Sequence, residues 1–235
     1  MGNVLKSVLD KDPEKNIAAF GFFTNYQVKD YFIEGSSVLA FGESDHLWAH
    51  LVSSDRDELS ILLEKHHKKT KCYFSVEDWM IPLILKYGTI DWKMTTNRFI
   101  LEENVNIKPP KIKVEKLNKS YASYVYKHSD YRDFISVNYT AERLNNDISA
   151  GIIINNLLVA WGFTHDDGAL GFLHVLDNYR GNGYGTDILL GLIQSRRETG
   201  RPVFGNIVPG NSASTYLVSK VGFELDRKTS WIKLV

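Results

Sequence analysis

The sequence is poor in cysteine, with Cys72 alone among its 235 residues. A single cysteine cannot form a disulfide within the chain, and the lack of a cysteine cluster argues against a zinc site. The N-terminal residues 1–6 have no apolar core like that of a signal peptide, and Lys6 stands where a myristoylation motif requires serine or threonine. We therefore expect a cytoplasmic protein that holds no metal.

The chain also lacks an excess of charge of either sign and any long apolar run. Lys+Arg and Asp+Glu each count 28, so the formal net charge is zero. This balance gives neither a nucleic-acid footprint nor a polybasic membrane surface. The longest apolar stretches, residues 79–85 and 148–163, are too short or are interrupted by asparagines, whereas a membrane span needs roughly 20 residues. We expect neither nucleic acid nor membrane as a partner.

What the sequence does contain is enough apolar residues for a core, and a boundary near its middle. Hydrophobic residues make up 43% of the chain, which is typical of a globular protein. Pro109 and Pro110, flanked by lysines, cannot continue a helix or a central strand. We interpret residues 1–108 and 109–235 as two domains. Periodicity and capping residues predict mixed α/β structure in the first, with strands over residues 37–41, 47–52, 72–74 and 92–101 and helices over residues 55–66 and 75–86.

The second domain is predicted to contain a mixed sheet with helices. Asn155-Asn156 suits the positive φ angles of a two-residue hairpin turn, and a second turn is expected over residues 165–168. An Asn or Ser cap begins the last helix, and Gly222 ends it. The elements expected before this helix, in order, are a strand over residues 112–117, helices over 119–128 and 131–145, strands over 150–154, 157–163 and 169–176, a helix from residue 184 and a strand over 203–208.

The most informative segment, residues 180–186, is a glycine-rich turn between a predicted strand and a predicted helix. The first turn of a helix leaves amide N–H groups unpaired, and glycines let an anion approach them. The helix dipole adds positive charge, so a phosphate or pyrophosphate would bind here. A dinucleotide fingerprint does not fit because Gly185 falls one residue early, and no Lys-Ser or Lys-Thr pair completes a phosphate loop. Taken alone, the segment is equally typical of a tight structural turn.

The pattern R-x-x-G-x-G directly after a strand resembles the coenzyme A pyrophosphate motif of the GNAT N-acyltransferase superfamily. Residues 211–223 are similar to its closing segment N-x-x-[AS]-x-x-L-x-x-[KR]-x-G-F. The resemblance covers residues 112–235. Within the superfamily, the chain is most similar to the glycine N-acyltransferase-like branch, because it shares Gly151, Val159-Ala160-Trp161 and Ser214 with that branch. It implies the GNAT acyltransferase fold in this half. The first half resembles the N-terminal part of such proteins, but this match is weaker. We interpret it as a divergent half that has no glycine cradle of its own.

The resemblance implies transfer of an acetyl or other short acyl group from coenzyme A to the primary amine of a small, amino-acid-like molecule. The backbone of residues 173–175 would bind the coenzyme's amide arm like an added strand, with the Val175 N–H facing the thioester carbonyl. We expect no metal, and a monomer or a homodimer. The residues expected to bind the coenzyme are Leu173, Val175, Arg180, Gly181, Asn182, Gly183, Tyr184, Gly185, Thr186, Asn211 and Ser214.

Proton transfer is where the chain departs from the superfamily. The usual glutamate base is replaced by Ala169, and the usual tyrosine acid by Val218. His174 and Asp167 are the candidate catalytic residues, although strand alternation turns His174 away from the side of Ala169 unless a bulge intervenes. Asp167 also suits ordinary turn chemistry. The two missing groups leave an alternative open, namely an inactive acyl-coenzyme A-binding module with a regulatory or assembly role.

Overall fold

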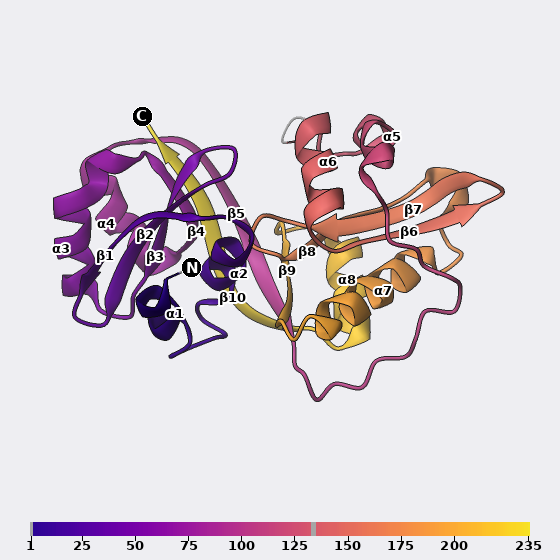
Figure 1. The fold of residues 1–235 in the computed structure, drawn as a ribbon, viewed down its shortest axis with the longest axis horizontal. Coiled ribbons are helices and arrows are strands. Elements are labelled where there is room, and N and C mark those ends of the chain that lie inside the picture. Colours follow the sequence, from indigo (N-terminus) through magenta and orange to yellow (C-terminus); the bar gives the residue numbers. More distant parts are fainter. Residues whose placement is uncertain (1, 133–134) are drawn as a thin grey trace. The chain divides into compact units, whose positions relative to one another are not determined.

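The computed structural model describes residues 2–132 and 135–235 (Figure 1). Within these residues, ten strands form one mixed sheet in the order β1-β2-β3-β4-β10-β5-β9-β8-β7-β6. The chain divides into two compact units, one of Met1–Arg98 with Asp226–Val235 and the other of Phe99–Leu225. The fold class expected from the sequence, a mixed α/β sheet protein, is confirmed. The boundary expected at residues 108/109 lies in the irregular segment between β5 and α5, and independent folding on either side of it stays a prediction.

The first unit packs helices against both faces of its strands. β1, β2 and β3 are antiparallel neighbours, β3 pairs with β4 in parallel, and β10 pairs with β4 in antiparallel orientation. One apolar core lies beneath α3 and α4, and a second contains Leu5 and Phe22 from α1 and α2. The elements are α1 (Asn3–Leu9), α2 (Ile17–Asn25), β1 (Val28–Glu34), β2 (Ser37–Glu43), β3 (Leu47–Val52), α3 (Arg56–His66), β4 (Cys72–Glu77), α4 (Ile81–Ile84), β5 (Ile90–Leu101) and β10 (Glu224–Leu234).

The second unit has the same arrangement of layers. β6, β7 and β8 are antiparallel, and β8 pairs with β9 in parallel. Figure 1 shows α5 and α6 on one face of β6, β7 and β8, and α7 on the other, and each face has its own apolar core. The elements are α5 (Ala122–His128), α6 (Val137–Asn146), β6 (Ser149–Ile154), β7 (Leu157–Thr164), β8 (Leu170–Val175), α7 (Tyr184–Glu198), β9 (Val203–Ile207) and α8 (Ser212–Val221).

Both units therefore follow one topology, in which two helices precede three antiparallel strands and a helix then leads to a parallel strand. β3-α3-β4 corresponds in this order to β8-α7-β9. The start of the crossing helix differs between them. The Asp55 carboxylate accepts hydrogen bonds from the amides of Asp57 and Glu58 at the start of α3, whereas the cap residue before α7 is Gly183, which has no side chain. The first half thus fills with its own carboxylate the place where an anion would bind.

Predictions that rest on local signals are confirmed. Asn155 and Asn156 have φ angles of 50° and 64°, as the two-residue hairpin turn requires. Asp55 caps α3, and the Asn211 side chain caps α8 by accepting from Ser214 N. Gly222 ends α8 in the left-handed region, at φ 105°.

Three element predictions are wrong. The helix expected over residues 75–86 shrinks to α4, because Val76 and Glu77 pair with β10 as part of β4. The strand expected over residues 112–117 is reduced to one bridge between Glu115 and Gly151. The helix expected from residue 131 begins at Val137, where the Ser136 hydroxyl accepts from Tyr139 N; residues 133–134 lie outside the described residues. In the first case pairing with β10 outweighs local propensity, and in the second the described residues offer only one backbone bridge to residues 112–117.

Candidate functional site

The glycine-rich segment forms an open loop at the N-terminus of α7. Gly181 and Gly183 have φ angles of 80° and 85°, which disfavour any residue with a side chain. A Cβ built on either glycine would meet nothing within 4 Å. Both positions therefore need glycine for backbone conformation, and the space in front of them is free of protein.

The backbone amides of this loop are not engaged by the protein. Among the described residues, no group accepts a hydrogen bond from the N–H groups of residues 181–185. Thr186 N, by contrast, donates to Gly183 O at 2.9 Å, and Asp187 N donates to the same oxygen at 3.1 Å. The expected cradle is therefore one residue shorter than the sequence suggested, because the Thr186 amide belongs to the first turn of the helix.

Two side chains hold the loop in shape. Arg180 Nε donates to Val175 O at 3.1 Å, and Arg180 Nη2 pairs with Asp177 Oδ1 at 2.8 Å. Asn182 Nδ2 donates to the carbonyl oxygens of Tyr179 and Arg180. Because 59% of the Arg180 side chain is exposed, its guanidinium can also contribute positive charge at the loop.

The strand that leads into the loop borders a gap in the sheet. β8 and β9 pair only at Leu170↔Gly205, although they are neighbours in the strand order. Leu176 N donates to Val159 O on β7, and successive residues of a strand direct their N–H groups to opposite sides. The Val175 N–H consequently points into the gap. Every residue of β8 after Leu170 is partly exposed, whereas β7 is almost completely buried.

A β-bulge changes which side chains share a face of β8. Trp161 and Phe163 on β7 are opposite His174 and Gly171, so β8 contains one extra residue between them. Phe172 has a φ of 49° in this bulge. Phe172 stacks on Phe163 and His174 stacks on Trp161, beneath α5 and α6, while Leu173 packs in the core beneath α7.

The bulge corrects the expectation for His174. Ala169 precedes Leu170, which packs toward α7, so alternation places Ala169 on the opposite face, the one beneath α5 and α6. Without a bulge His174 would lie on the face of Leu170. With the bulge it lies on the face of Ala169, the position where the superfamily is expected to carry its base.

His174 is mostly buried and has an acidic partner. Its side chain is 13% exposed, and its Nδ1 lies 3.4 Å from Asp130 Oδ2, just after α5. Burial lowers the pKa of His174 below its usual value, and the Asp130 carboxylate opposes that shift. The imidazole is therefore neutral at neutral pH. With Nδ1–H donated to Asp130, the lone pair of Nε2 can accept a proton. No sequence signal indicates Asp130, because it meets His174 only through the fold.

The other catalytic candidate, Asp167, is completely buried in the turn before β8. Its Oδ1 accepts from Ala169 N at 3.0 Å, and its Oδ2 accepts from Asn206 Nδ2 at 3.4 Å. Burial raises the pKa of Asp167 to about 6, partly offset by the Ala169 amide and by Arg196 and Arg143. Of the two candidates, only His174 reaches the partly exposed stretch of β8.

The middle of α8 packs against the first turn of α7, through Leu217. A Cβ on Gly185 would lie 3.6 to 3.9 Å from side-chain carbons of Leu173, Val175 and Leu217, so β8, α7 and α8 meet at this glycine. Asn211 Oδ1 is used for the cap on Ser214 N at 3.0 Å, which leaves its Nδ2 group as a possible donor. Tyr216 is 70% exposed and contributes nothing to this junction.

The described residues contain neither a metal-binding cluster nor a membrane-spanning helix. In the part of the chain that the structure describes, no group of three or more His, Cys, Asp and Glu side chains is arranged to hold a metal ion. No helix in residues 2–132 or 135–235 combines the length and the apolar composition that crossing a membrane would require.

Comparison with known proteins supports the resemblance. Residues 150–232 match the family described as FR47-like protein. An X-ray structure of a Drosophila melanogaster protein is 21% identical, with a TM-score of 0.71 over 85% of this chain and 74% of that chain. A GCN5-related N-acetyltransferase from Kribbella flavida is 14% identical, with a TM-score of 0.61 over 94% of each chain. A GNAT-family acetyltransferase from Colwellia psychrerythraea is 12% identical, with a TM-score of 0.54 over 97% of each chain.

Identities of this size establish the fold and leave the reaction open. No curated protein is significantly similar to the chain in sequence. The GNAT-like fold expected of the C-terminal half is confirmed, because the FR47-like match runs from β6 to β10 and the solved structures share the fold.

Proposed function

With an FR47-like domain over residues 150–232 and a GNAT-like fold as the premise, we propose that this protein is an N-acyltransferase. It transfers an acetyl or other short acyl group from coenzyme A to the primary amine of a small, amino-acid-like acceptor. The observation that carries the proposal is the row of unengaged amides over residues 181–185, directly after a strand whose free edge borders a gap.

The residues around the gap suit each part of the coenzyme. The diphosphate binds to the amides of residues 181–185, where the dipole of α7 adds positive charge. The pantetheine arm lies along the free edge of β8, and the Val175 N–H polarises the thioester carbonyl. Asn211 Nδ2 donates to the arm while its Oδ1 continues to cap α8. Arg180 shapes the loop through Val175 O.

His174 is the base in this proposal, and Asp130 positions it. An amine acceptor is mostly protonated at neutral pH and must lose a proton before it attacks the thioester. A neutral imidazole next to a carboxylate can take that proton, since the carboxylate stabilises the imidazolium that forms. The coenzyme A thiolate leaves without a dedicated acid because thiols ionise near pH ~8.5, so valine at position 218 is acceptable.

One observation favours a second candidate function, an inactive module that binds acyl-coenzyme A. Ala169 and Val218 stand where the superfamily is expected to carry its base and acid. The two functions are distinguished by measuring acetyl-coenzyme A binding and the release of free thiol with a panel of small primary amines. Enzymatic transfer predicts binding and amine-dependent thiol release. Tight binding without thiol release for any amine would support the module.

A further inference from the structure

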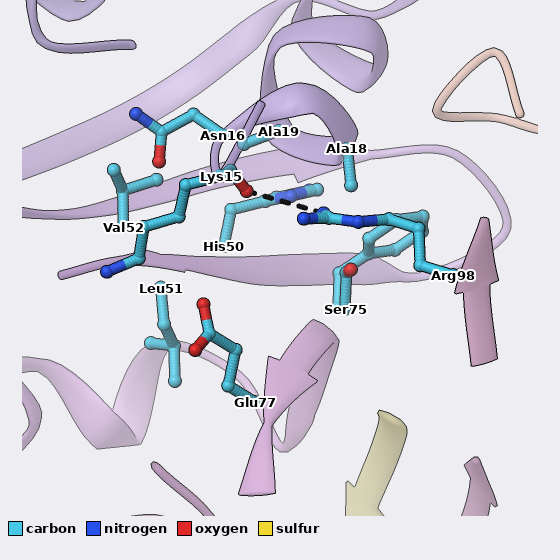
Figure 2. A pocket seen from close by; sticks show the side chains of 11 residues that line it. Lys15, Asn16, Ala18, Ala19, His50, Leu51, Val52, Ser75, Glu77 and Arg98 are labelled. Atoms are coloured by element: carbon cyan, nitrogen blue, oxygen red, sulfur yellow. Dashed lines mark hydrogen bonds between the residues drawn. The ribbon is translucent and has the colours of Figure 1, made fainter. Parts of the chain in front are cut away.

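A pocket with a cavity volume of about 20 Å³ lies in the first unit (Figure 2). Its wall comes from the segment before α2, from α2 itself, and from β3, β4 and β5. Figure 2 shows the His50 ring and the Arg98 guanidinium extending from opposite sides toward the same space, below the segment that carries Lys15. The residues around the pocket are Lys15, Asn16, Ala18, Ala19, His50, Leu51, Val52, Phe74, Ser75, Glu77 and Arg98.

The pocket occupies the place that corresponds, in the topology of the first unit, to the gap between β8 and β9. β3 and β4 pair in parallel from Trp48↔Cys72 to His50↔Phe74, and no pairing between them continues after His50. Ser75, directly after this point, has a φ of 53°, unusual for a residue with a side chain. Ligands commonly bind beyond the carboxyl ends of parallel strands where neighbours separate.

His50 presents a polar atom that the protein does not use. It is 1% exposed, and in the described residues its Nε2 has no hydrogen-bond partner. The rings of Phe22, Phe23 and Phe74 lie 4.4, 4.7 and 4.8 Å from its ring, centroid to centroid. Burial lowers the pKa of His50 to about 3, so the ring is neutral and can donate one N–H. A buried donor without a partner is unfavourable unless a ligand or water satisfies it.

Arg98 supplies a charged group with donors to spare. Its side chain is 2% exposed, and its Nε pairs with Asp226 Oδ2 at 2.6 Å. Nη1 donates to Lys15 O at 3.3 Å and Nη2 donates to Glu14 O at 3.1 Å. Each terminal nitrogen of a guanidinium carries two N–H groups, so each retains one donor after these bonds. A guanidinium fork matches the geometry of a carboxylate.

The remaining charged groups favour an anion. Glu77 is the only acidic residue that lines the pocket in the described chain, and its Oε1 already pairs with Arg227 Nη1 at 3.0 Å. Its Oε2 accepts from Trp79 Nε1. Lys15 Nζ donates hydrogen bonds to Ser53 O, at 2.6 Å, and to the Ser54 hydroxyl. With Glu77 compensated by Arg227, and Asp226 by Arg98, the lysine charge is not balanced by an acid.

The size of the pocket and the capping of α3 limit what can bind. A cavity volume of about 20 Å³ exceeds the ~10–15 Å³ that one water requires, yet it admits only a few non-hydrogen atoms. The Asp55 carboxylate occupies the amides at the start of α3, so a diphosphate has no cradle in this unit. Ala18, Ala19 and Phe74 offer an apolar wall for a short hydrocarbon group.

We propose that this pocket is a second ligand site, which binds an acetate-sized carboxylate between Arg98 and His50. The carboxylate accepts from the free N–H groups of the guanidinium and from the imidazole Nε2, and its methyl group packs on Ala18 and Phe74. The site does not depend on the acyltransferase activity, because all its residues belong to the first unit.

The test is a titration of the full chain, labelled with ¹⁵N-histidine, with sodium acetate against sodium chloride at constant ionic strength and neutral pH. The His50 signals, assigned with a His50→Phe variant, are expected to shift saturably with acetate only. Ala18→Leu fills the pocket without removing a polar group and is expected to weaken binding by about tenfold or more. Val4→Leu, which places the same residue on an exposed face of α1, is the control and should bind normally.

Three results would overturn the proposal: no saturable shift of the His50 signals, an equal shift with chloride, or unchanged acetate affinity in Ala18→Leu. A crystal structure grown in acetate that shows only water on His50 Nε2 would also overturn it. A Gly183→Glu variant separates the two proposals, since the loss of coenzyme binding there should leave the acetate response intact.

Discussion

Asp130 Oδ2 lies 3.4 Å from His174 Nδ1 and joins the turn after α5 to the strand β8. Because of the bulge at Phe172, the His174 side chain lies on the face of β8 beneath α5 and α6, where it meets Asp130. The glycine motif is therefore not the only part of the proposed site. It is accompanied by a histidine and a carboxylate that meet only in the folded chain, and each can be tested by itself.

His174→Ala should lower kcat by about 10²-fold or more, within the range that a positioned base contributes, without changing the Kd of acetyl-coenzyme A. The affinity is unchanged because the coenzyme contacts the backbone of β8. Steady-state kinetics together with calorimetric titration of the coenzyme measure both effects. An unaltered kcat would remove His174 from the mechanism, and His46→Ala, an exposed histidine of the first unit, is the control.

Asp130→Asn should lower kcat less than His174→Ala and should change its pH dependence. Asp130 raises the pKa of His174 against the effect of burial, so its removal shifts that pKa further down. The wild-type rate falls as the pH drops through the pKa of His174, and in the variant this fall moves to lower pH. A pH–rate profile that keeps its acidic limb in place would contradict a positioning role for Asp130.

Gly183→Glu should abolish coenzyme binding, because a side chain and a negative charge then occupy the cradle. Gly200→Glu is the control for the strain that a side chain causes at a positive φ. Gly200 lies at the other end of α7, has a φ of 65° and has open space around it. The control should lose some stability, about 1 kcal/mol, and keep its affinity for the coenzyme. Equal losses of affinity in both variants would mean that strain, and not the cradle, explains the result.

Asp167→Asn should stabilise the protein at neutral pH. The pKa of Asp167 in the folded state, about 6, lies above its ordinary value of 3.8. Its stabilising contribution is therefore present below about pH 4 and is lost as the pH rises to about 6. Asparagine removes this effect and raises the free energy of unfolding at pH 7 by on the order of 1 kcal/mol. Asn206 Oδ1, which has no partner in the described residues, can accept from the new amide after an amide flip.

Urea unfolding at about pH 4 and pH 7 checks this prediction. The variant should gain stability relative to the wild type only at the higher pH. A loss of stability that is larger at pH 7 than at pH 4 would show that the carboxylate is stabilised in its charged form by Arg196 and Arg143, contrary to the raised pKa.

The features predicted from the sequence are those that local chemistry determines. The glycines at 181 and 183, the Asn211 cap and the Asn155-Asn156 turn each act within a few residues of themselves, and the structure contains all of them. The strand expected over residues 112–117 fails for the opposite reason. Its apolar alternation is real, but among the described residues only Glu115 forms a backbone bridge to β6, and no local signal indicates this.

The contacts that could not be predicted from the sequence are those between segments far apart in the chain. The face occupied by His174 depends on a one-residue register shift against β7, and alternation alone predicts the opposite face. In the sequence, Asp130 looks like any aspartate of a surface loop. Only the folded chain brings it beside His174 on β8. The pocket of the first unit likewise needs Arg98, His50 and Asp226, which come from three strands.

A crystal structure with acetyl-coenzyme A would test the central claim most directly. The account predicts the diphosphate on the amides of residues 181–185, the pantetheine arm in the gap between β8 and β9, and the thioester oxygen at the Val175 N–H. An empty loop at saturating coenzyme, or the coenzyme bound elsewhere on the chain, would contradict it.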